Sequence, residues 1–379
     1  FAMKSALVYS LAAAQLVAAF DTRRVEDVPR FLQCDPKWGN DQMGVKGPGE
    51  QATICREGCA MTSLTMALNG LGLYINDTQL DPGVMNSWLQ ANDGYTCAGG
   101  DCNNLVLDAP ERIPGSPLVF LGEKEKPSME VLTEYANSDR EVVLAHVRNS
   151  SHFVYVRPSD QGSKGVFNVL DPNFNVSTYE YDDISDIIHY HVERVDGAMD
   201  YPTFKQCDSR WGDNVMGQNN ETVCQVGCLM SSISEALNGH NITISDHESN
   251  PETLNQFLRT HRGGYVGNTS SLEESVVPLV NPTHVTWPSD GMHVTNDLSP
   301  ATIAEYIGAP STNGDVAKHR VVIANVLEGG HFVLVQGLGG KNRSSMKSSV
   351  FVHDSGFARG IYSFDEVVGW RIYDMVAVE

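Results

Sequence analysis

Helix patterns occur at matching places in the two halves of the chain. Apolar residues recur at helical spacing from Met61 to Leu68, and Asn69-Gly70 follows as a typical helix C-terminus. The second half repeats this pattern and ends it at Gly239. Pro is favoured at the first helical position, so we expect a further helix after Asp81-Pro82 and after Asn250-Pro251.

Strand patterns occupy the later part of each half. Short runs rich in Val, Ile and aromatic residues, bounded by polar turns, predict strands. The expected strands are Val142–Val147, Phe153–Val156 and Val166–Leu170, followed by Val321–Val326, Phe332–Val335 and Ser349–His353. Helices that precede antiparallel strands are typical of an α+β fold, and they argue against a parallel α/β sheet.

A long internal repeat accounts for the duplicated pattern. Residues 28–44 match residues 201–217, and each stretch contains Gln-Cys-Asp followed by Trp-Gly. Gly-Cys-Ala-Met-Thr-Ser at 58–63 recurs as Gly-Cys-Leu-Met-Ser-Ser in the second half. The period of about 175 residues is much longer than the roughly 20–45 residues of solenoid repeats. The sequence therefore predicts two tandem domains, at 28–197 and 198–379.

The charge balance narrows the function classes. The chain has 379 residues, with 47 Asp and Glu against 26 Lys and Arg and a formal net charge of -21. Such a charge repels phosphate backbones, so we expect no nucleic-acid partner. After the N-terminus no apolar run reaches the roughly 20 residues of a spanning helix, so we expect no membrane span in the mature chain. We also expect no cofactor or metal, because no motif indicates a nucleotide, haem or metal. The Gly-rich stretch 337–340 lacks the helix of a phosphate-binding loop.

The N-terminus has the pattern of a secretory signal peptide. Lys4 precedes a short apolar core, and Ala18 and Ala19 supply the small residues of a cleavage site. We expect residues 1–19 to be removed near Ala19–Phe20, and a short anchoring helix is the alternative. Seven glycosylation sequons agree with export: Asn76, Asn149, Asn175, Asn220, Asn241, Asn268 and Asn342. We therefore expect a secreted protein or one of an endomembrane lumen, in an extracellular, vacuolar or lysosomal compartment.

The eight cysteines can be sorted by the repeat. Cys97 and Cys102 occur only in the first half and can close a local loop. Each half keeps three matched cysteines, and an odd number in an exported protein indicates one free thiol. Cys59 and Cys228 follow a Gly and open a helix, whose N-terminus stabilises a thiolate. The expected disulfides are Cys34–Cys55, Cys97–Cys102 and Cys207–Cys224. Inert buried thiols, another pairing or a zinc site are the alternatives, the last one weak without a matching His pair.

Each half also contains a His and an Asp placed to serve such a thiol. His152 and His331 each begin a predicted strand, and Asp171 and Asp354 each end the next one. In an antiparallel pair the start of one strand lies beside the end of its neighbour, so imidazole and carboxylate can meet. A nucleophilic thiol needs a base, and the base needs an orienting group. Gln33 and Gln206, which precede the first matched cysteine of each half, are candidate donors to an oxyanion.

Taken together, these motifs resemble the papain-like cysteine peptidases. The most similar subgroup is cysteine peptidase family thirty-nine, best known for processing bacteriocin leaders at a double glycine. The resemblance implies two papain-like domains, each with a helix that carries Cys packed on an antiparallel sheet. It implies nucleophiles at Cys59 and Cys228, bases at His152 and His331, orienting Asp171 and Asp354, and oxyanion donors at Gln33 and Gln206. The sequence departs from the family at Ala60 and Leu229, where a smaller residue often follows the nucleophile.

The leading hypothesis is a secreted thiol-dependent hydrolase that forms an acyl-enzyme on a peptide or protein substrate. A catalytically degenerate pair of peptidase folds, used for binding or structure, is the second hypothesis, and a thiol acyltransferase is the third. The sequons at Asn149 and Asn175 lie close in sequence to His152 and Asp171. If they carry glycans that crowd this site, we expect the second domain to be the better enzyme.

Overall fold

The computed structural model describes residues 28–44, 52–98, 101–159, 161–308, 319–339 and 348–378. The expected signal peptide, its cleavage site and the sequon at Asn342 lie outside the described residues. The chain forms two compact units. Within the described part, the first unit runs to Leu71 and continues over Leu80–Ala109 and Phe120–His191. The second contains Gly72–Gln79, Pro110–Val119 and the part from Val192 onward.

The units and the sequence repeats therefore have different boundaries. The repeats predict a division after residue 197, whereas the compact units divide between His191 and Val192. The physical reason is strand β11 (Arg194–Asp196), which pairs with strand β15 (His331–Gly339) of the second unit. Two short segments of the first repeat also belong to the second unit.

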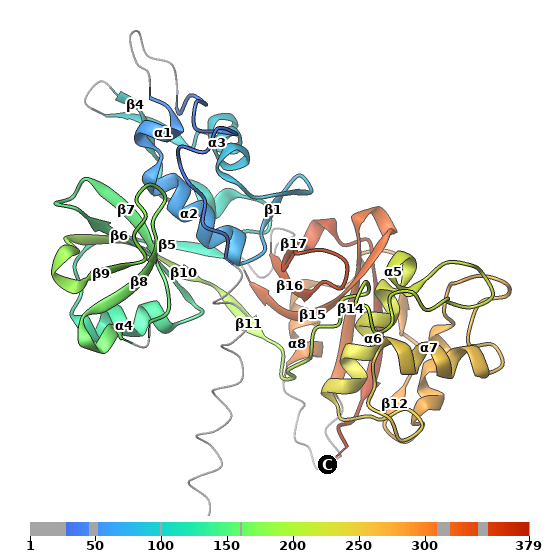
Figure 1. The fold of residues 1–379 in the computed structure, drawn as a ribbon. Coiled ribbons are helices and arrows are strands. Elements are labelled where there is room, and N and C mark those ends of the chain that lie inside the picture. Colours follow the sequence, from blue (N-terminus) through green and yellow to red (C-terminus); the bar gives the residue numbers. More distant parts are fainter. Residues whose placement is uncertain are drawn as a thin grey trace, which may run out of the picture. The chain divides into compact units, whose positions relative to one another are not determined.

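The first unit is built on a six-stranded sheet (Figure 1). Its strand order is β5 (Leu118–Glu125), β10 (Asp186–Val192), β6 (Glu141–Val147), β7 (His152–Val156), β8 (Val166–Leu170) and β9 (Thr178–Glu180). Antiparallel pairing joins β10 to β6 and then β6, β7, β8 and β9 in turn. A separate antiparallel hairpin is formed by β3 (Tyr95–Ala98) and β4 (Asp101–Leu105). The three strands predicted in this half are confirmed, each within one residue at its start.

The first unit also contains helices, two of which pack on this sheet. They are α1 (Ile54–Glu57), α2 (Cys59–Gly70), α3 (Pro82–Ala91) and α4 (Met129–Asn137). Helix α2 packs on β7, and Leu132 and Ala136 of α4 enter a core with Val143 and Val154. Asp81 caps α3 by accepting from the backbone of Val84, which explains the start of this helix at Pro82.

The second unit repeats the sheet order with additions. Its strands follow the order β12 (Val285–Thr286), β18 (Gly369–Met375), β14 (His319–Val326), β15, β16 (Ser349–His353) and β17 (Ile361–Ser363). Strand β13 (Met292–His293) pairs with β18, and β11 pairs with β15. Every pair is antiparallel. The unit also holds the hairpin of β1 (Tyr74–Ile75) and β2 (Thr78–Gln79).

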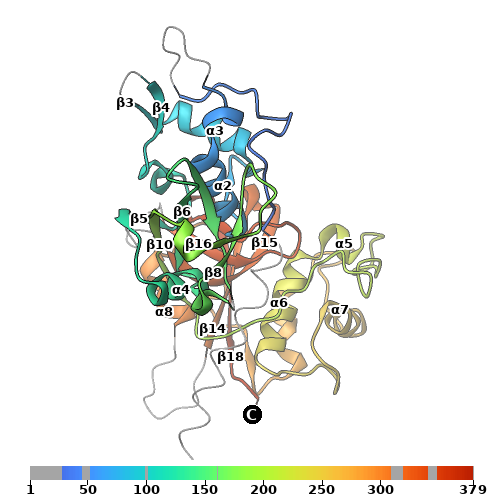
Figure 2. The ribbon, with the colours of Figure 1, turned by 60° about the vertical axis from the view of Figure 1, so that its left-hand side comes forward.

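The second sheet is covered on both faces. Its helices are α5 (Val223–Val226), α6 (Cys228–Gly239), α7 (Pro251–Thr260) and α8 (Pro300–Ile307). Val321 and Ile323 of β14 join the core under α6 and α7, whereas the alternate residues Val322 and Ala324 join the core under α8. Figure 2 shows α6 and α7 on one side of this sheet and α8 on the other. The fold is thus mixed α and β with antiparallel sheets, as expected for the α+β class.

Short 3-10 turns connect these elements. They lie at Ala109–Arg112, Gly162–Lys164, Tyr181–Asp183, Glu274–Val280, Leu327–Gly329 and Phe364–Glu366. Throughout the described ranges, no helix is both long and apolar enough to cross a bilayer.

The glycines at the ends of α2 and α6 have a different role from the one expected. The sequence suggests a helix-ending cap at Gly70 and Gly239, and both helices do end there. A Cβ at Gly70 would lie 2.5 Å from Cγ2 of Val28, and one at Gly239 would lie 2.8 Å from the carbonyl oxygen of Asp200. Glycine is therefore required at these positions because the segment before each repeat's Gln-Cys motif packs closely against them. A left-handed turn is not the reason.

Candidate active site

A tight backbone turn places one free thiol at the start of a helix in each unit. Gly58 and Gly227 separate a one-turn helix from α2 and α6, and a Cβ at either would come within 2.4 Å of a carbonyl oxygen. Only glycine fits there, so the next residue begins the long helix. That residue is Cys59 in the first unit and Cys228 in the second, and both are half-buried and free.

Histidine and aspartate meet beside these helices in both units. Nε2 of His152 lies 2.8 Å from Oδ1 of Asp171, and Nε2 of His331 lies 2.8 Å from Oδ1 of Asp354. All four side chains are buried. Each histidine opens the strand on which the cysteine helix packs, and each aspartate directly follows the neighbouring strand. The strand pairing thus brings together the residues that the sequence predicts.

The remaining oxygen of each aspartate is also held. Oδ1 of Asp354 accepts the backbone N–H groups of Gly356 and Phe357, and Oδ2 accepts the hydroxyl of Tyr362 at 2.8 Å. In the first unit Asp171 accepts from the backbone of two following residues and from the hydroxyl of Tyr179 at 2.9 Å. A carboxylate with this many donors has one fixed orientation, and so has the imidazole that it binds.

Charge and hydrogen bonding shift the pKa of these groups together. Burial lowers the pKa of His152, but hydrogen bonds with Asp171 and Cys59 outweigh burial and raise it to about 9. Burial likewise lowers the pKa of His331, but Asp354 and Cys228 raise it to about 9. Although burial raises the pKa of each aspartate, the hydrogen bond from the histidine and those from nearby backbone N–H groups bring it below its usual value. The imidazolium form is therefore stabilised between an anionic aspartate and the cysteine.

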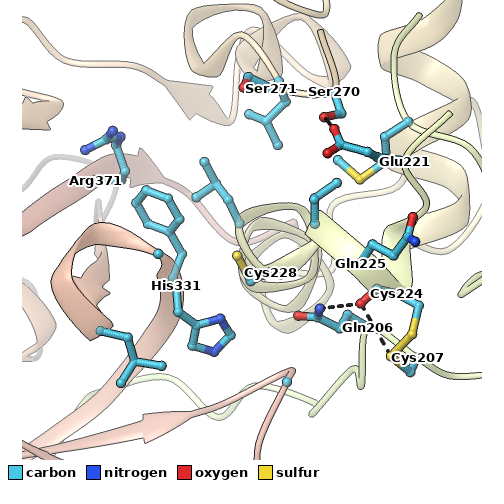
Figure 3. A pocket seen from close by; sticks show the side chains of 18 of the residues that line it. Gln206, Cys207, Glu221, Cys224, Gln225, Cys228, Ser270, Ser271, His331 and Arg371 are labelled. Atoms are coloured by element: carbon cyan, nitrogen blue, oxygen red, sulfur yellow. Dashed lines mark hydrogen bonds between the residues drawn. A yellow bond between two sulfur atoms is a disulfide. The ribbon is translucent and has the colours of Figure 1, made fainter. Parts of the chain in front are cut away.

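The two ring nitrogens of each histidine consequently have different partners. Nε2 of His331 is engaged by Asp354, so Nδ1 is the nitrogen left for Cys228. Figure 3 shows Cys228, His331 and Gln206 at one end of the same cleft. A thiol, a base with one nitrogen fixed, and an orienting carboxylate form the arrangement that activates a sulfur nucleophile.

The predicted oxyanion donors occupy matching places. Gln33 and Gln206 are buried, and Nε2 of each donates to the carbonyl oxygen of a disulfide cysteine, Cys55 or Cys224, at 2.7 Å. A side-chain amide nitrogen has two hydrogens, so this bond fixes the amide and leaves one hydrogen for another acceptor. In the second unit Oε1 of Gln206 accepts from Ser355, which fixes the orientation of the amide further.

The structure contains the three expected disulfides. They are Cys34–Cys55, Cys97–Cys102 and Cys207–Cys224. Cys34 and Cys207 directly follow the two glutamines, and their bridges tie this segment to the short helix before the free cysteine. The disulfide thereby fixes the distance between the amide donor and the thiol in each unit.

A cleft of about 870 Å³ opens beside the second thiol. Its lining includes Cys228, His331 and Gln206 together with apolar side chains such as Leu229 and Phe332. Three charged residues complete the wall: Glu221, Glu274 and Arg371. Glu274 and Arg371 form an ion pair at 2.8 Å, and each side chain is 12% exposed.

The matched positions in the first unit are uncharged. The hydroxyl of Tyr373 donates to the backbone of Glu274 at 3.2 Å. The matching Tyr190 of the first unit donates to the backbone of Leu107 at 2.9 Å, so Leu107 is the counterpart of Glu274. The equal strand registers make Ile188 the counterpart of Arg371. The first unit therefore has an aliphatic pair where the second has a buried ion pair.

The six described sequon asparagines are all exposed: Asn76, Asn149, Asn175, Asn220, Asn241 and Asn268. Asn149 lies in the turn between β6 and β7, three residues before His152. Oδ1 of Asn175 lies 3.5 Å from Nη1 of Arg30, whose Nε donates to the backbone of Asp171. Exposure leaves these positions accessible to glycan addition.

Two residues of each site, a tyrosine and a phenylalanine that follow the aspartate, are not among the residues identified from the sequence. The tyrosines Tyr179 and Tyr362 each follow the aspartate by eight residues, and Phe174 and Phe357 follow it by three. Each Phe ring packs edge-on against the histidine at 5.1 Å between ring centroids. The signal in the sequence is this equal spacing in both repeats.

Comparison with protein-family models, with curated proteins and with solved structures finds no match to this chain. The interpretation of the site therefore depends on its own geometry.

Proposed function

We propose that the protein is an exported thiol-dependent hydrolase with a papain-like catalytic arrangement in each of its two units. The observation that carries the proposal is the Cys–His–Asp geometry, which occurs twice with the same atoms in contact. In both units Nε2 of the histidine meets Oδ1 of the aspartate at 2.8 Å and the histidine interacts with the free cysteine. Three disulfides and exposed sequons agree with an extracellular or lumenal compartment.

The proposed reaction is acyl transfer to water. Sγ of Cys228 attacks the carbonyl carbon of an amide, a C–S bond forms and the carbonyl oxygen becomes an oxyanion. The free amide hydrogen of Gln206 and the backbone N–H of Cys228 stabilise this oxyanion. The oxyanion collapses, the C–N bond breaks, and the imidazolium of His331 gives its proton to the leaving amine.

Hydrolysis of the thioester completes the cycle. The neutral imidazole of His331 takes a proton from water, and the hydroxide attacks the acyl carbon. The C–S bond breaks, the carboxylic acid leaves and the thiolate–imidazolium pair is restored. Asp354 remains ionised throughout, because its low pKa favours the carboxylate. The same roles apply to Cys59, His152, Asp171 and Gln33 in the first unit.

The proposed substrate is a peptide or protein segment. The cleft of about 870 Å³ beside Cys228 is large enough for several residues of an extended chain, and its mixed lining offers apolar contacts and charged groups. An acyl-transfer site of this kind also accepts other amides, so the substrate class is part of the proposal.

A substrate-like probe that alkylates the reactive thiol tests the proposal. A peptidyl acyloxymethyl ketone is incubated with the non-reduced protein, and the modified cysteine is identified by mass spectrometry. The expected result is modification of Cys59 or Cys228 in the native protein, and its loss after unfolding or after His152→Ala or His331→Ala. No modification at either thiol, or equal modification of native and unfolded protein, would favour a binding or structural role instead.

A further inference from the structure

A buried arginine stands behind the aspartate of the second site. Arg359 is 6% exposed, and its guanidinium lies 3.7 Å from the ring centroid of Tyr362. Tyr362 in turn donates to Oδ2 of Asp354 at 2.8 Å, and Asp354 holds His331. A chain of direct contacts therefore runs from Arg359 to the imidazole.

The arginine is itself held by three groups. Nε donates to the backbone oxygen of Ile361, Nη2 to Glu366 and Nη1 to Oδ1 of Asp77 at 3.0 Å. A planar guanidinium bound on all three nitrogens has one orientation. Its flat face is therefore fixed against the ring of Tyr362, where cation–π attraction adds to the packing.

One of these supports comes from the first sequence repeat. Asp77 lies at the turn of the hairpin β1–β2. This hairpin belongs to the second compact unit, although it lies more than a hundred residues before the start of the second sequence repeat. The backbone of Gly360 donates to Gly72 at the start of this segment at 3.1 Å, and a Cβ at Gly72 would come 2.3 Å from that nitrogen. Burial raises the pKa of the Tyr74 phenol in this hairpin, and the charge of nearby Asp354 raises it further.

Among the described residues, the first site has no equivalent of this arrangement. Five residues after Asp171 stands Val176, whereas Arg359 stands five residues after Asp354. Tyr179 is approached instead by Arg148, an exposed residue whose guanidinium lies 3.8 Å from the ring centroid of Phe174. In the described part of the first unit, the guanidinium that approaches this tyrosine is thus an exposed one.

We propose that Arg359 is a positioning residue of the second site, fixed by Asp77 and acting on His331 through Tyr362 and Asp354. The inference rests on the proposed function, because it assumes that the orientation of His331 matters for Cys228. It adds that the second site depends on a segment of the first repeat.

Loss of positioning and loss of charge have opposite effects on the alkylation rate of Cys228, which makes the proposal testable. Removal of a cation beside Asp354 leaves its carboxylate with a stronger hold on the imidazolium, so charge alone predicts equal or faster alkylation of Cys228. Loss of positioning frees the ring of Tyr362 and loosens Asp354 and His331, so it predicts slower alkylation.

The experiment measures iodoacetamide alkylation of each thiol in the full, non-reduced chain across pH 5–9, by peptide mass spectrometry. Arg359→Gln is expected to slow alkylation of Cys228 at pH 6 about fivefold, as expected for residues coupled in one network. Cys59 serves as the reference in the same molecule, and its rate is expected to stay unchanged.

Asp77→Asn is a second variant in case Arg359→Gln does not fold. It keeps the glycosylation sequon and Arg359, and we expect it to slow alkylation of Cys228 about twofold to threefold. Asp246→Asn is the matched control, because Asp246 occupies the equivalent turn position with a similar positive φ and is exposed. Its Cys228 rate is expected to equal that of the wild type.

The outcomes separate this inference from the proposed function. The proposal is supported if either test variant slows alkylation of Cys228 and leaves alkylation of Cys59 unchanged, while Asp246→Asn changes neither rate. Wild-type or faster alkylation of Cys228 in folded Arg359→Gln and Asp77→Asn overturns it while leaving the proposed function in place. Slow, ordinary alkylation of Cys228 already in the wild type overturns both.

Discussion

The buried ion pair in the second cleft gives a quantitative prediction about stability. Glu274 and Arg371 meet at 2.8 Å with each side chain 12% exposed. Replacing Glu274 by Gln leaves a partly buried guanidinium without its carboxylate, and the upper limit of the cost is the roughly 3–5 kcal/mol of fully buried pairs. Arg371 keeps the carbonyl oxygen of Trp370 at 3.1 Å as an acceptor, so we expect the lower end, about 3 kcal/mol. This corresponds to a roughly 150-fold change in the folding equilibrium of the second unit.

The first unit supplies the rescue variant. At the matched positions it carries Leu107 and Ile188, and Ile188 is 1% exposed. We expect the double variant Glu274→Leu and Arg371→Ile to be within about 1 kcal/mol of the wild type, because apolar groups of similar volume replace a buried pair at little cost.

Urea titration of the full chain, read by peptide-resolved hydrogen exchange, reports the second unit separately. Asp290→Asn is the matched control, since it also converts a carboxylate to an amide in an Arg pair. The side chain of Asp290 is 45% exposed, and we expect a loss of about 1 kcal/mol or less. The reasoning is refuted if Glu274→Gln costs no more than this control, or if the double variant is less stable than the single one.

Three further predictions concern the two sites. An NMR titration is expected to give a pKa of about 9 for the imidazole of His331, and Cys228→Ser should lower this pKa. The pKa in the unfolded chain is about 6.5, so the shift stabilises the folded protein fully below pH 6.5. This contribution to stability is lost as pH rises through about 9. Replacement of both Cys207 and Cys224 by Ala opens a loop of 17 residues, so we expect a loss of about 3 kcal/mol in urea unfolding. Enzymatic removal of glycans should speed alkylation of Cys59 and leave Cys228 unchanged, and an equal response of both thiols would argue against crowding at the first site.

The repeat makes much of the fold predictable from one sequence. Helix α2 and strand β7 were expected because apolar periodicity and turn residues agree locally, and they agree twice. The same duplication identifies Cys59, His152 and Asp171 as residues to test together, since antiparallel pairing must bring a strand start near the end of its neighbour. Parity of the cysteines predicts one free thiol in each half, and the helix start at Cys59 and Cys228 then predicts the disulfide pairs.

The contacts behind the aspartates are not predictable in this way. The equal spacing in both repeats identifies Tyr362 as a matched residue, but a core tyrosine would show the same spacing, and only the structure shows its hydroxyl on Asp354. Arg359 has a valine as its counterpart, and its partner Asp77 lies 282 residues away. Neither local pattern nor the repeat contains that information, because it depends on where a distant hairpin packs. The boundary of the compact units follows from the same packing.

The central claim is that the histidine of each site activates its free thiol as a nucleophile. Alkylation of the non-reduced chain by iodoacetamide at pH 6, resolved for each cysteine, tests it most directly. A thiol with a pKa of about 8.5 is only about 0.3% ionised at this pH. We predict alkylation of Cys59 and Cys228 at least about tenfold faster than this fraction allows, and a fall to the ordinary rate after His152→Ala or His331→Ala. Ordinary rates for both thiols in the wild type, with no response to the histidine variants, would contradict the account.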